Sequence, residues 1–173
     1  MRYFSDDLYV GAEQFPPDPT RVVQVFDFDD TLTLKPASFN NTHMSKDQFF
    51  DHARHFLPDQ AVVDILRLAH SLGDAIAVAT SRPPDRMYET IAWLWKHDIH
   101  FDQILLSTNK LTSAITKQAM FRKLQKDYRK IGMVVDDSPY NIEGARLQEI
   151  DAILVDKNSA YWSTHPEPVY KFE

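Results

Sequence analysis

The stretch Arg21-Val22-Val23-Gln24-Val25-Phe26-Asp27-Phe28-Asp29-Asp30-Thr31-Leu32-Thr33 decides the fold class of this chain. It begins as an apolar run rich in β-branched residues, which is typical of a buried strand, and continues into three closely spaced carboxylates. Side chains alternate along an extended chain, so Asp27 and Asp29 start on the same side where the backbone leaves the sheet. Because like charges repel, a hard divalent ion such as Mg²⁺ is expected between them. The alternative is a strand followed by an acidic turn that caps a helix.

Two further predicted strands also end in polar residues. Residues 75–79 form an apolar run that leads into Thr-Ser-Arg at 80–82. Residues 131–135 form another, which leads into two aspartates at 136–137. Ligands of an open parallel sheet bind at the carboxyl ends of its strands, so these groups are predicted to meet at one edge.

The segment between the second and third of these polar groups contains a predicted helix that carries a lysine. Lys117 is predicted to open a helix over residues 117–128, where the helix dipole favours bound anions. Lys110 is the competing candidate for phosphate binding. We prefer Lys117 because of its place at the start of an amphipathic helix.

The ordered set of acid pair, hydroxyl, lysine and acid pair resembles the haloacid dehalogenase (HAD) superfamily of phosphohydrolases. The first motif of that superfamily resembles residues 27–31, the second Thr80, the third Lys117 and the fourth residues 136–137. The resemblance covers roughly residues 22–156.

By this resemblance Asp27 is the nucleophile and Asp29 the general acid and base. Physical reasoning leads to similar roles, because a phosphate dianion repels a carboxylate until a metal and fixed donors neutralise its charge. Asp27 would then form a covalent acyl phosphate, which divides one difficult hydrolysis into two easier displacements. Asp29 would protonate the leaving oxygen and later take the proton of the attacking water.

The other motif residues would hold the phosphate and the metal. The resemblance implies phosphate binding by Thr80, Ser81 and Lys117. Arg82 either contacts the substrate phosphate through two hydrogen bonds or caps a backbone carbonyl, and we assign it to substrate binding. Mg²⁺ is the expected cofactor, and its expected ligands are the aspartates Asp27, Asp29, Asp136 and Asp137.

The rest of the chain reads as helices that alternate with strands. Helical apolar spacing predicts helices over residues 60–72, 85–97, 117–128 and 139–148, and the remaining strands are predicted over residues 102–106 and 152–155. The predicted fold class is therefore α/β, a three-layer Rossmann-like (HAD-like) fold with a central, mainly parallel, five-stranded sheet and helices on both faces.

We expect one catalytic domain at residues 21–156, with an extended lead-in at residues 1–20 and a tail at residues 157–173 that packs on the domain. A small insert at residues 33–58 contains one amphipathic helix that follows a capping box at Ser45. Family members that enclose small metabolites have far longer insertions, so the resemblance implies a capless or minimally capped site. The tail is expected to be fastened by aromatic residues, which could instead form a partner surface: Tyr161, Trp162, Tyr170 and Phe172.

Composition narrows the class of protein. The chain has 173 residues, of which 43% are hydrophobic, and no cysteine, so we expect one well-packed domain without disulfides or thiolate chemistry. The sequence shows neither a secretion signal nor a long apolar run, and a cytoplasmic protein without membrane contact is expected. The formal net charge of −6 argues against a broadly basic nucleic-acid surface, although a local basic groove remains compatible with it.

The expected function is a magnesium-dependent phosphomonoesterase that acts through an aspartyl phosphate. Within the superfamily the chain is most similar to the phosphatase domain of polynucleotide kinases, which implies a nucleotide or nucleic-acid end with a 3′-phosphate as substrate. It departs from that pattern at Ser138-Pro139, where arginine is common. The alternatives are a phosphatase of a phosphoprotein or glycan, a phosphotransferase or mutase, and a non-catalytic phosphate-binding module. No obligate protein partner is evident.

Several other residues have two possible roles. Asp30 is assigned to the turn and Asn141 to fixing the loop after the second acid pair, rather than to catalysis or substrate contact. His52 and His55 are assigned to a solvated helix face rather than to a metal site. Three aromatic residues are assigned to packing rather than to base stacking: Trp93, Trp95 and Phe101.

Overall fold

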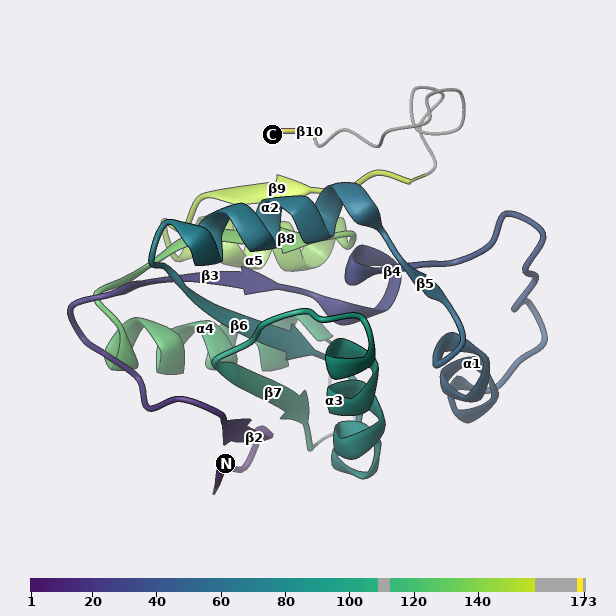
Figure 1. The fold of residues 1–173 in the computed structure, drawn as a ribbon, viewed down its shortest axis with the longest axis horizontal. Helices are drawn as coiled ribbons and strands as arrows, with labels where there is room; N and C mark the ends of the chain where they lie inside the picture. Colours follow the sequence, from purple (N-terminus) through teal and green to yellow (C-terminus); the bar gives the residue numbers. More distant parts are fainter. Residues whose placement is uncertain (109–112, 158–170, 173) are drawn as a thin grey trace.

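The computed structural model describes residues 1–108, 113–157 and 171–172. Within them, one eight-stranded sheet has the order β1-β2-β7-β6-β3-β8-β9-β10 (Figure 1). The strands are β1 (Arg2–Ser5), β2 (Tyr9–Glu13), β3 (Val22–Phe26), β6 (Ala75–Thr80), β7 (Gln103–Ser107), β8 (Lys130–Asp136), β9 (Ala152–Leu154) and β10 (Lys171–Phe172). The five strands from β7 to β9 in this order pair in parallel, whereas β1, β2 and β10 add antiparallel edges.

Helices cover both faces of the sheet. In Figure 1, α2 (Gln60–Ser71) and α3 (Met87–Lys96) lie in front of it, and α4 (Ser113–Asp127) and α5 (Pro139–Leu147) lie behind. The predicted fold class is confirmed, because the structure is a three-layer α/β fold with five parallel strands at its centre. Strand β10, in the C-terminal segment, pairs in antiparallel fashion with β9 and forms this edge of the sheet.

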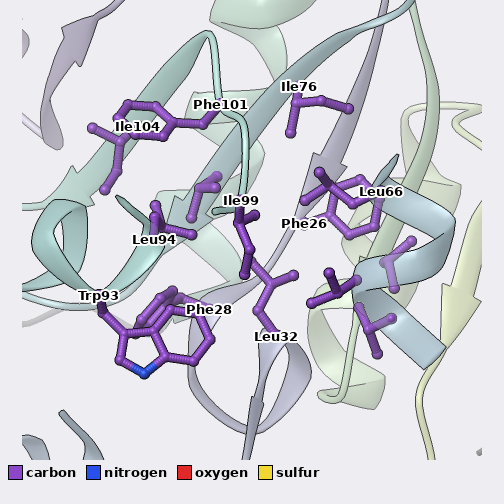
Figure 2. Packing of buried hydrophobic residues seen from close by; sticks show 14 of the residues in the cluster. Phe26, Phe28, Leu32, Leu66, Ile76, Trp93, Leu94, Ile99, Phe101 and Ile104 are labelled. Atoms are coloured by element: carbon purple, nitrogen blue, oxygen red, sulfur yellow. The ribbon is translucent and has the colours of Figure 1, made fainter. Parts of the chain in front are cut away.

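Because side chains alternate along a strand, the core is divided between the two faces of the sheet. The same alternation sets the direction of the Asp27 side chain. Figure 2 shows Phe26 and Ile76 of the sheet packed with Leu66 of α2, on the face that α2 and α3 cover. Val25 belongs to the cluster on the opposite face, which α4 and α5 cover. Asp27 follows Phe26, so the alternation turns its side chain toward α4.

Of the three aromatic residues assigned to packing, two are buried in the structure and one is exposed. Trp93 and Phe101 are buried in the core, and the indole nitrogen of Trp93 donates a hydrogen bond to the carbonyl oxygen of Phe56 at 2.9 Å. Trp95, by contrast, is 57% exposed, and its predicted packing role is wrong. Trp95 lies two residues after Trp93, and residues two positions apart face different sides of a helix. His52 and His55 are exposed, as predicted.

The insert extends beyond the carboxyl ends of the strands (Figure 1). It leaves the body through β4 (Thr33–Leu34) and returns through β5 (Leu57–Pro58), and these two strands pair in antiparallel fashion. Between them lies α1 (Lys46–Ala53), whose predicted capping box at Ser45 is present. The helix ends at Ala53. The insert is therefore a short flap beside the strand ends rather than an enclosing domain.

The first 20 residues contain more structure than an extended lead-in. Strand β2 pairs with β7, and β1 pairs with β2. Gly11 permits this approach, because a Cβ atom at this position would lie 2.4 Å from the carbonyl oxygen of Ile104. The tail residues Tyr161, Trp162 and Tyr170 lie outside the described residues, as does Lys110. Among the helices of the described part, none has the length and apolarity needed to cross a bilayer.

Candidate active site

Three elements that are distant in sequence bring Asp27, Asp136 and Lys117 together. Asp27 follows β3, Asp136 ends β8, and Lys117 projects from α4. The ammonium nitrogen of Lys117 lies 2.7 Å from Asp27 Oδ1 and 2.6 Å from Asp136 Oδ2. Because β3 and β8 are neighbouring parallel strands, their carboxyl ends place both acids at one edge.

A threonine joins the first acid to Asp137. Thr31 Oγ1 lies 3.1 Å from Asp27 Oδ2 and 3.2 Å from Asp137 Oδ1, within hydrogen-bonding distance of both. Thr31 lies within the first motif, but no role was predicted for it from the sequence. Its place four residues after Asp27, directly after the acidic turn, is the signal that could have identified it.

The acids form a set of donors suited to a hard cation. Asp27, Asp136 and Asp137 each offer a carboxylate oxygen, and these oxygens all lie within 4.8 Å of one another. Carboxylate oxygens are the ligands that Mg²⁺ prefers, so the donor chemistry fits this ion. The side chain of Asp29, the fourth expected ligand, does not belong to this close group.

The pKa shifts of the acids and the lysine show that this buried cluster favours a positive charge beside the carboxylates. Burial, together with the charge of Asp27, raises the pKa of Asp137 to about 9. The same two causes raise the pKa of Asp136. Burial would lower the pKa of Lys117, but the charges of Asp136 and Asp27 outweigh it and raise that pKa. Lys117 is thus a permanently charged ammonium group among crowded acids.

The loop after β8 fixes the orientation of Asp136. Asn141 Nδ2 donates to Asp136 Oδ2 at 3.0 Å, and the backbone N–H of Ser138 donates to Asp136 Oδ1 at 2.9 Å. Asn141 lies in α5 and contacts Asp136 itself and Ser113, whereas the role assigned to it was to fix the loop after the acid pair. Asp136 therefore has little freedom to turn away from Lys117.

The helix that carries Lys117 starts earlier than predicted. Helix α4 begins at Ser113 and not at Lys117, so the lysine lies in the second helical turn. The N-terminal dipole is therefore not the reason for its position, because that effect fades within the first turn. Lys117 is 2% exposed and points from the buried face of α4 toward the strand ends, where the acids are.

The hydroxyl groups after β6 reach the same edge of the sheet. Thr80 is the last residue of β6 and is buried, and its Oγ1 accepts a hydrogen bond from the backbone N–H of Arg82 at 3.2 Å. Ser81 is exposed. Because β6 is the parallel neighbour of β3, Thr80 and Ser81 lie at a strand end beside that of Asp27.

Arg82 has a partner that the sequence did not predict. Its Nε and Nη2 atoms donate to the two carboxylate oxygens of Asp29 at 2.7 and 2.8 Å. The guanidinium group is 1% exposed and lies over the rings of Phe28 and Phe50, at 4.6 and 4.8 Å from their centroids. Arg82 neither caps a carbonyl nor points freely into the site. Its two hydrogen bonds fix the direction of the Asp29 carboxylate.

The backbone between the acids explains why Asp27 and Asp29 have different partners. The turn at Phe28–Leu32 is interrupted by an extended Asp29 and a left-handed Asp30, whose φ is 61°. Aspartate tolerates this left-handed conformation better than most residues. Strand alternation therefore stops at the turn, and the side chain of Asp29 points toward Arg82 instead of lying on the same side as that of Asp27.

The fixed pairing of Arg82 with Asp29 makes a testable prediction. Lys can keep the charge at this position but cannot form the planar pair of hydrogen bonds, so we expect Arg82→Lys to lower kcat for an aryl phosphate by about tenfold or more. We expect KM to change by less than about threefold, because the lost contact is not to substrate. The exposed Arg67, changed to Lys, is the matched control. A higher KM with unchanged kcat would instead support the substrate-binding role.

Comparison with known proteins finds similarity at the level of structure. No family model matches the sequence, and no curated protein matches it. A chain of the Pnkp1/Rnl/Hen1 RNA repair complex superimposes with a TM-score of 0.68 at 18% identity, over 83% of this chain and 45% of that one. A protein from Mesorhizobium loti described as a HAD-like phosphatase has a TM-score of 0.63 at 12% identity, with 94% and 85% covered.

A third similar structure is SP0104 from Streptococcus pneumoniae, a hydrolase of the haloacid dehalogenase-like family. Its TM-score is 0.55 at 15% identity, over 85% of this chain and 91% of that one. The present chain spans about half the length of the two RNA repair chains that it matches. Together with the topology of the sheet, these structures show that the chain has the HAD-like fold.

Proposed function

We propose that this protein is a magnesium-dependent phosphomonoesterase in which Asp27 is the nucleophile. The observation that supports this proposal best is the ammonium group of Lys117 between Asp27 and Asp136, with Asp137 beside them. Such a group of acids and one buried cation is suited to a ligand that carries both negative charge and a divalent ion. The HAD-like fold of the three phosphatase and repair structures adds support at the level of fold.

The proposed chemistry uses the residues in distinct roles. Asp27 attacks the phosphorus atom, which forms a bond to its carboxylate oxygen as the bond to the leaving alcohol breaks. Asp29 protonates the leaving oxygen and later takes a proton from the water that releases phosphate, and one of its two hydrogen bonds from Arg82 opens while it carries that proton. Lys117, with Thr80 and Ser81, would contact the phosphoryl oxygens. Bound Mg²⁺ would supply positive charge to those oxygens.

The ion would be held by a subset of the predicted ligands. The close oxygens of Asp27, Asp136 and Asp137 favour these three as its side-chain ligands. Both side-chain oxygens of Asp29 are held by Arg82, so we do not propose it as a side-chain ligand. Its acid and base role is proposed from the resemblance of residues 27–31 to the first motif of the superfamily.

We further propose nucleotides or nucleic-acid ends with a 3′-phosphate as substrates. The short flap supports this choice, because it leaves room for a substrate larger than a metabolite. The similarity to a chain of an RNA repair complex is consistent with it. We also propose that the protein is cytoplasmic.

A substrate panel tests the proposal directly. The purified protein would be given an aryl phosphate, mononucleotides, a 3′-phosphorylated oligonucleotide, a sugar phosphate and a phosphopeptide, with Mg²⁺ or with a chelator. We expect free phosphate only with Mg²⁺, and the highest kcat/KM for nucleotides or the oligonucleotide. Strong selectivity for the sugar phosphate or the peptide would refute the substrate class, and an isomer formed without free phosphate would indicate a mutase.

Mg²⁺ should also stabilise the folded protein, independently of any turnover. An ion that binds only the folded state raises the free energy of unfolding, by about 2.7 kcal/mol at 100 times its Kd. We therefore expect Mg²⁺ to raise Tm in thermal unfolding, and Asp137→Asn to remove most of this increase. Asp151→Asn, an exposed aspartate outside the cluster, is the control. An equal increase in wild type and Asp137→Asn would argue against the assigned ligands.

A further inference from the structure

A second lysine, whose side chain is only 16% exposed, lies against the acidic turn, outside the four sequence motifs. Lys157 follows β9, and its Nζ donates to the carbonyl oxygens of Thr31 at 3.2 Å and Thr33 at 2.8 Å. The same atom lies 3.3 Å from Asp59 Oδ2. One ammonium group thus connects the end of the sheet, the acidic turn and the start of α2.

The surroundings give this lysine one charged partner, Asp59, in addition to its two carbonyl acceptors. Burial lowers the pKa of Lys157, and the charge of Asp59 opposes that shift, so the site must compensate the desolvation of the charge. Helix α2 does not need the lysine for its cap, because Asp59 Oδ1 already accepts from the backbone N–H groups of Ala61 and Val62. Because Asp59 is fully buried, an apolar side chain in place of Lys157 would leave its carboxylate without a charged partner, so Lys157 also has the structural role of pairing Asp59.

The turn that Lys157 holds is the one that orients the proposed nucleophile. Thr31 provides both the carbonyl oxygen that Lys157 contacts and the hydroxyl group that lies against Asp27 and Asp137. The turn is not a regular helix, since Asp29 and Asp30 depart from helical dihedral angles. Inside the turn the Thr33 N–H donates to the Phe28 carbonyl oxygen and the Asp30 N–H donates to Thr33 Oγ1. Lys157 adds an outside donor to the carbonyl groups of Thr31 and Thr33, which further restricts the movement of the turn.

We propose that Lys157 is a positioning residue for the nucleophile, which it holds in place through the backbone of Thr31 and Thr33. This inference rests on the proposed phosphatase function. Lys157 touches neither the substrate nor Asp27 in this role. It acts by limiting how far the Thr31 hydroxyl group, and with it the Asp27 carboxylate, can move from the attack geometry.

The test compares three variants of the full chain. Lys157→Met removes the donors and keeps the length of the side chain, Lys157→Arg keeps charge and donors, and Lys96→Met changes an exposed lysine as the control. Each is measured for kcat and KM with an aryl phosphate and Mg²⁺, well below its own Tm, and for amide hydrogen exchange in residues 28–33.

For Lys157→Met we expect kcat to fall by about tenfold or more, KM to stay within about threefold of wild type, and exchange in the turn to become faster. Lys157→Arg should recover part of the lost kcat. A lower Tm with kcat within about threefold of wild type would overturn the inference, because it is the result of a merely structural role. If wild type releases no phosphate from any substrate, the proposed function fails first, and the inference falls with it.

Asp59 provides an independent check on the same contact. Asp59→Asn keeps the oxygen that caps α2 and removes the negative charge that faces Lys157. We expect it to speed exchange in residues 28–33 in the same direction as Lys157→Met, by a smaller factor. Unchanged exchange in both variants would show that Lys157 does not hold the turn.

Discussion

Asp27→Asn should reduce the release of phosphate from an aryl phosphate by about 10³-fold or more, because a neutral amide is a poor nucleophile and no other carboxylate occupies its place. The substitution keeps the volume of the side chain, and the amide oxygen can still accept a hydrogen bond from Lys117, which now lies 2.7 Å from Asp27 Oδ1. The measurement is steady-state phosphate release with Mg²⁺, together with thermal unfolding to establish that the variant is folded.

Asp30→Asn is the matched control for this variant. Asp30 is the second aspartate after Asp27 in the chain, it lies in the adjoining turn, and asparagine also tolerates its left-handed φ of 61°. We expect its kcat to stay within about threefold of wild type, which would agree with a turn role for Asp30. If Asp27→Asn keeps wild-type turnover, the nucleophile is another group and the proposed mechanism is wrong.

The part of this molecule that the sequence could predict is the part set by local patterns. Apolar runs gave the parallel strands, and the polar residues at their ends gave the edge where Asp27 and Asp136 meet. Both follow from short-range rules, since alternation fixes the face of a side chain and parallel pairing fixes which ends lie together. The antiparallel pair β1 and β2 was missed because both strands are short and neither contains a continuous apolar run like those of the parallel strands.

The parts that escaped prediction depend on long side chains and on turns. Arg82 could reach several partners from its position, and only the folded turn shows that Asp29 is the one it binds. Lys157 follows the last predicted strand in a stretch with no motif, and its contact with Thr31 spans 126 positions. Such contacts are fixed by tertiary packing, which a one-dimensional pattern does not contain.

Lys117→Met should have two effects that share one cause. Removing the ammonium group leaves Asp27 and Asp136 facing each other in a buried site, and loss of one partner of such a pair costs about 3–5 kcal/mol. It also removes a donor that would stabilise the phosphoryl group in the transition state, for which we expect kcat to fall by about 10²–10³-fold. Lys126→Met, an exposed position on the same helix, should change neither quantity appreciably.

Mg²⁺ should separate these two effects of Lys117→Met. A divalent ion can neutralise the same acids, so added Mg²⁺ should restore much of the lost stability, and the increase in Tm should exceed that of wild type. It should not restore kcat, because the ion does not replace a second, independently placed donor. Recovery of both Tm and kcat would mean that Lys117 serves only to balance charge among the acids, whereas recovery of Tm alone assigns it a direct part in phosphoryl transfer.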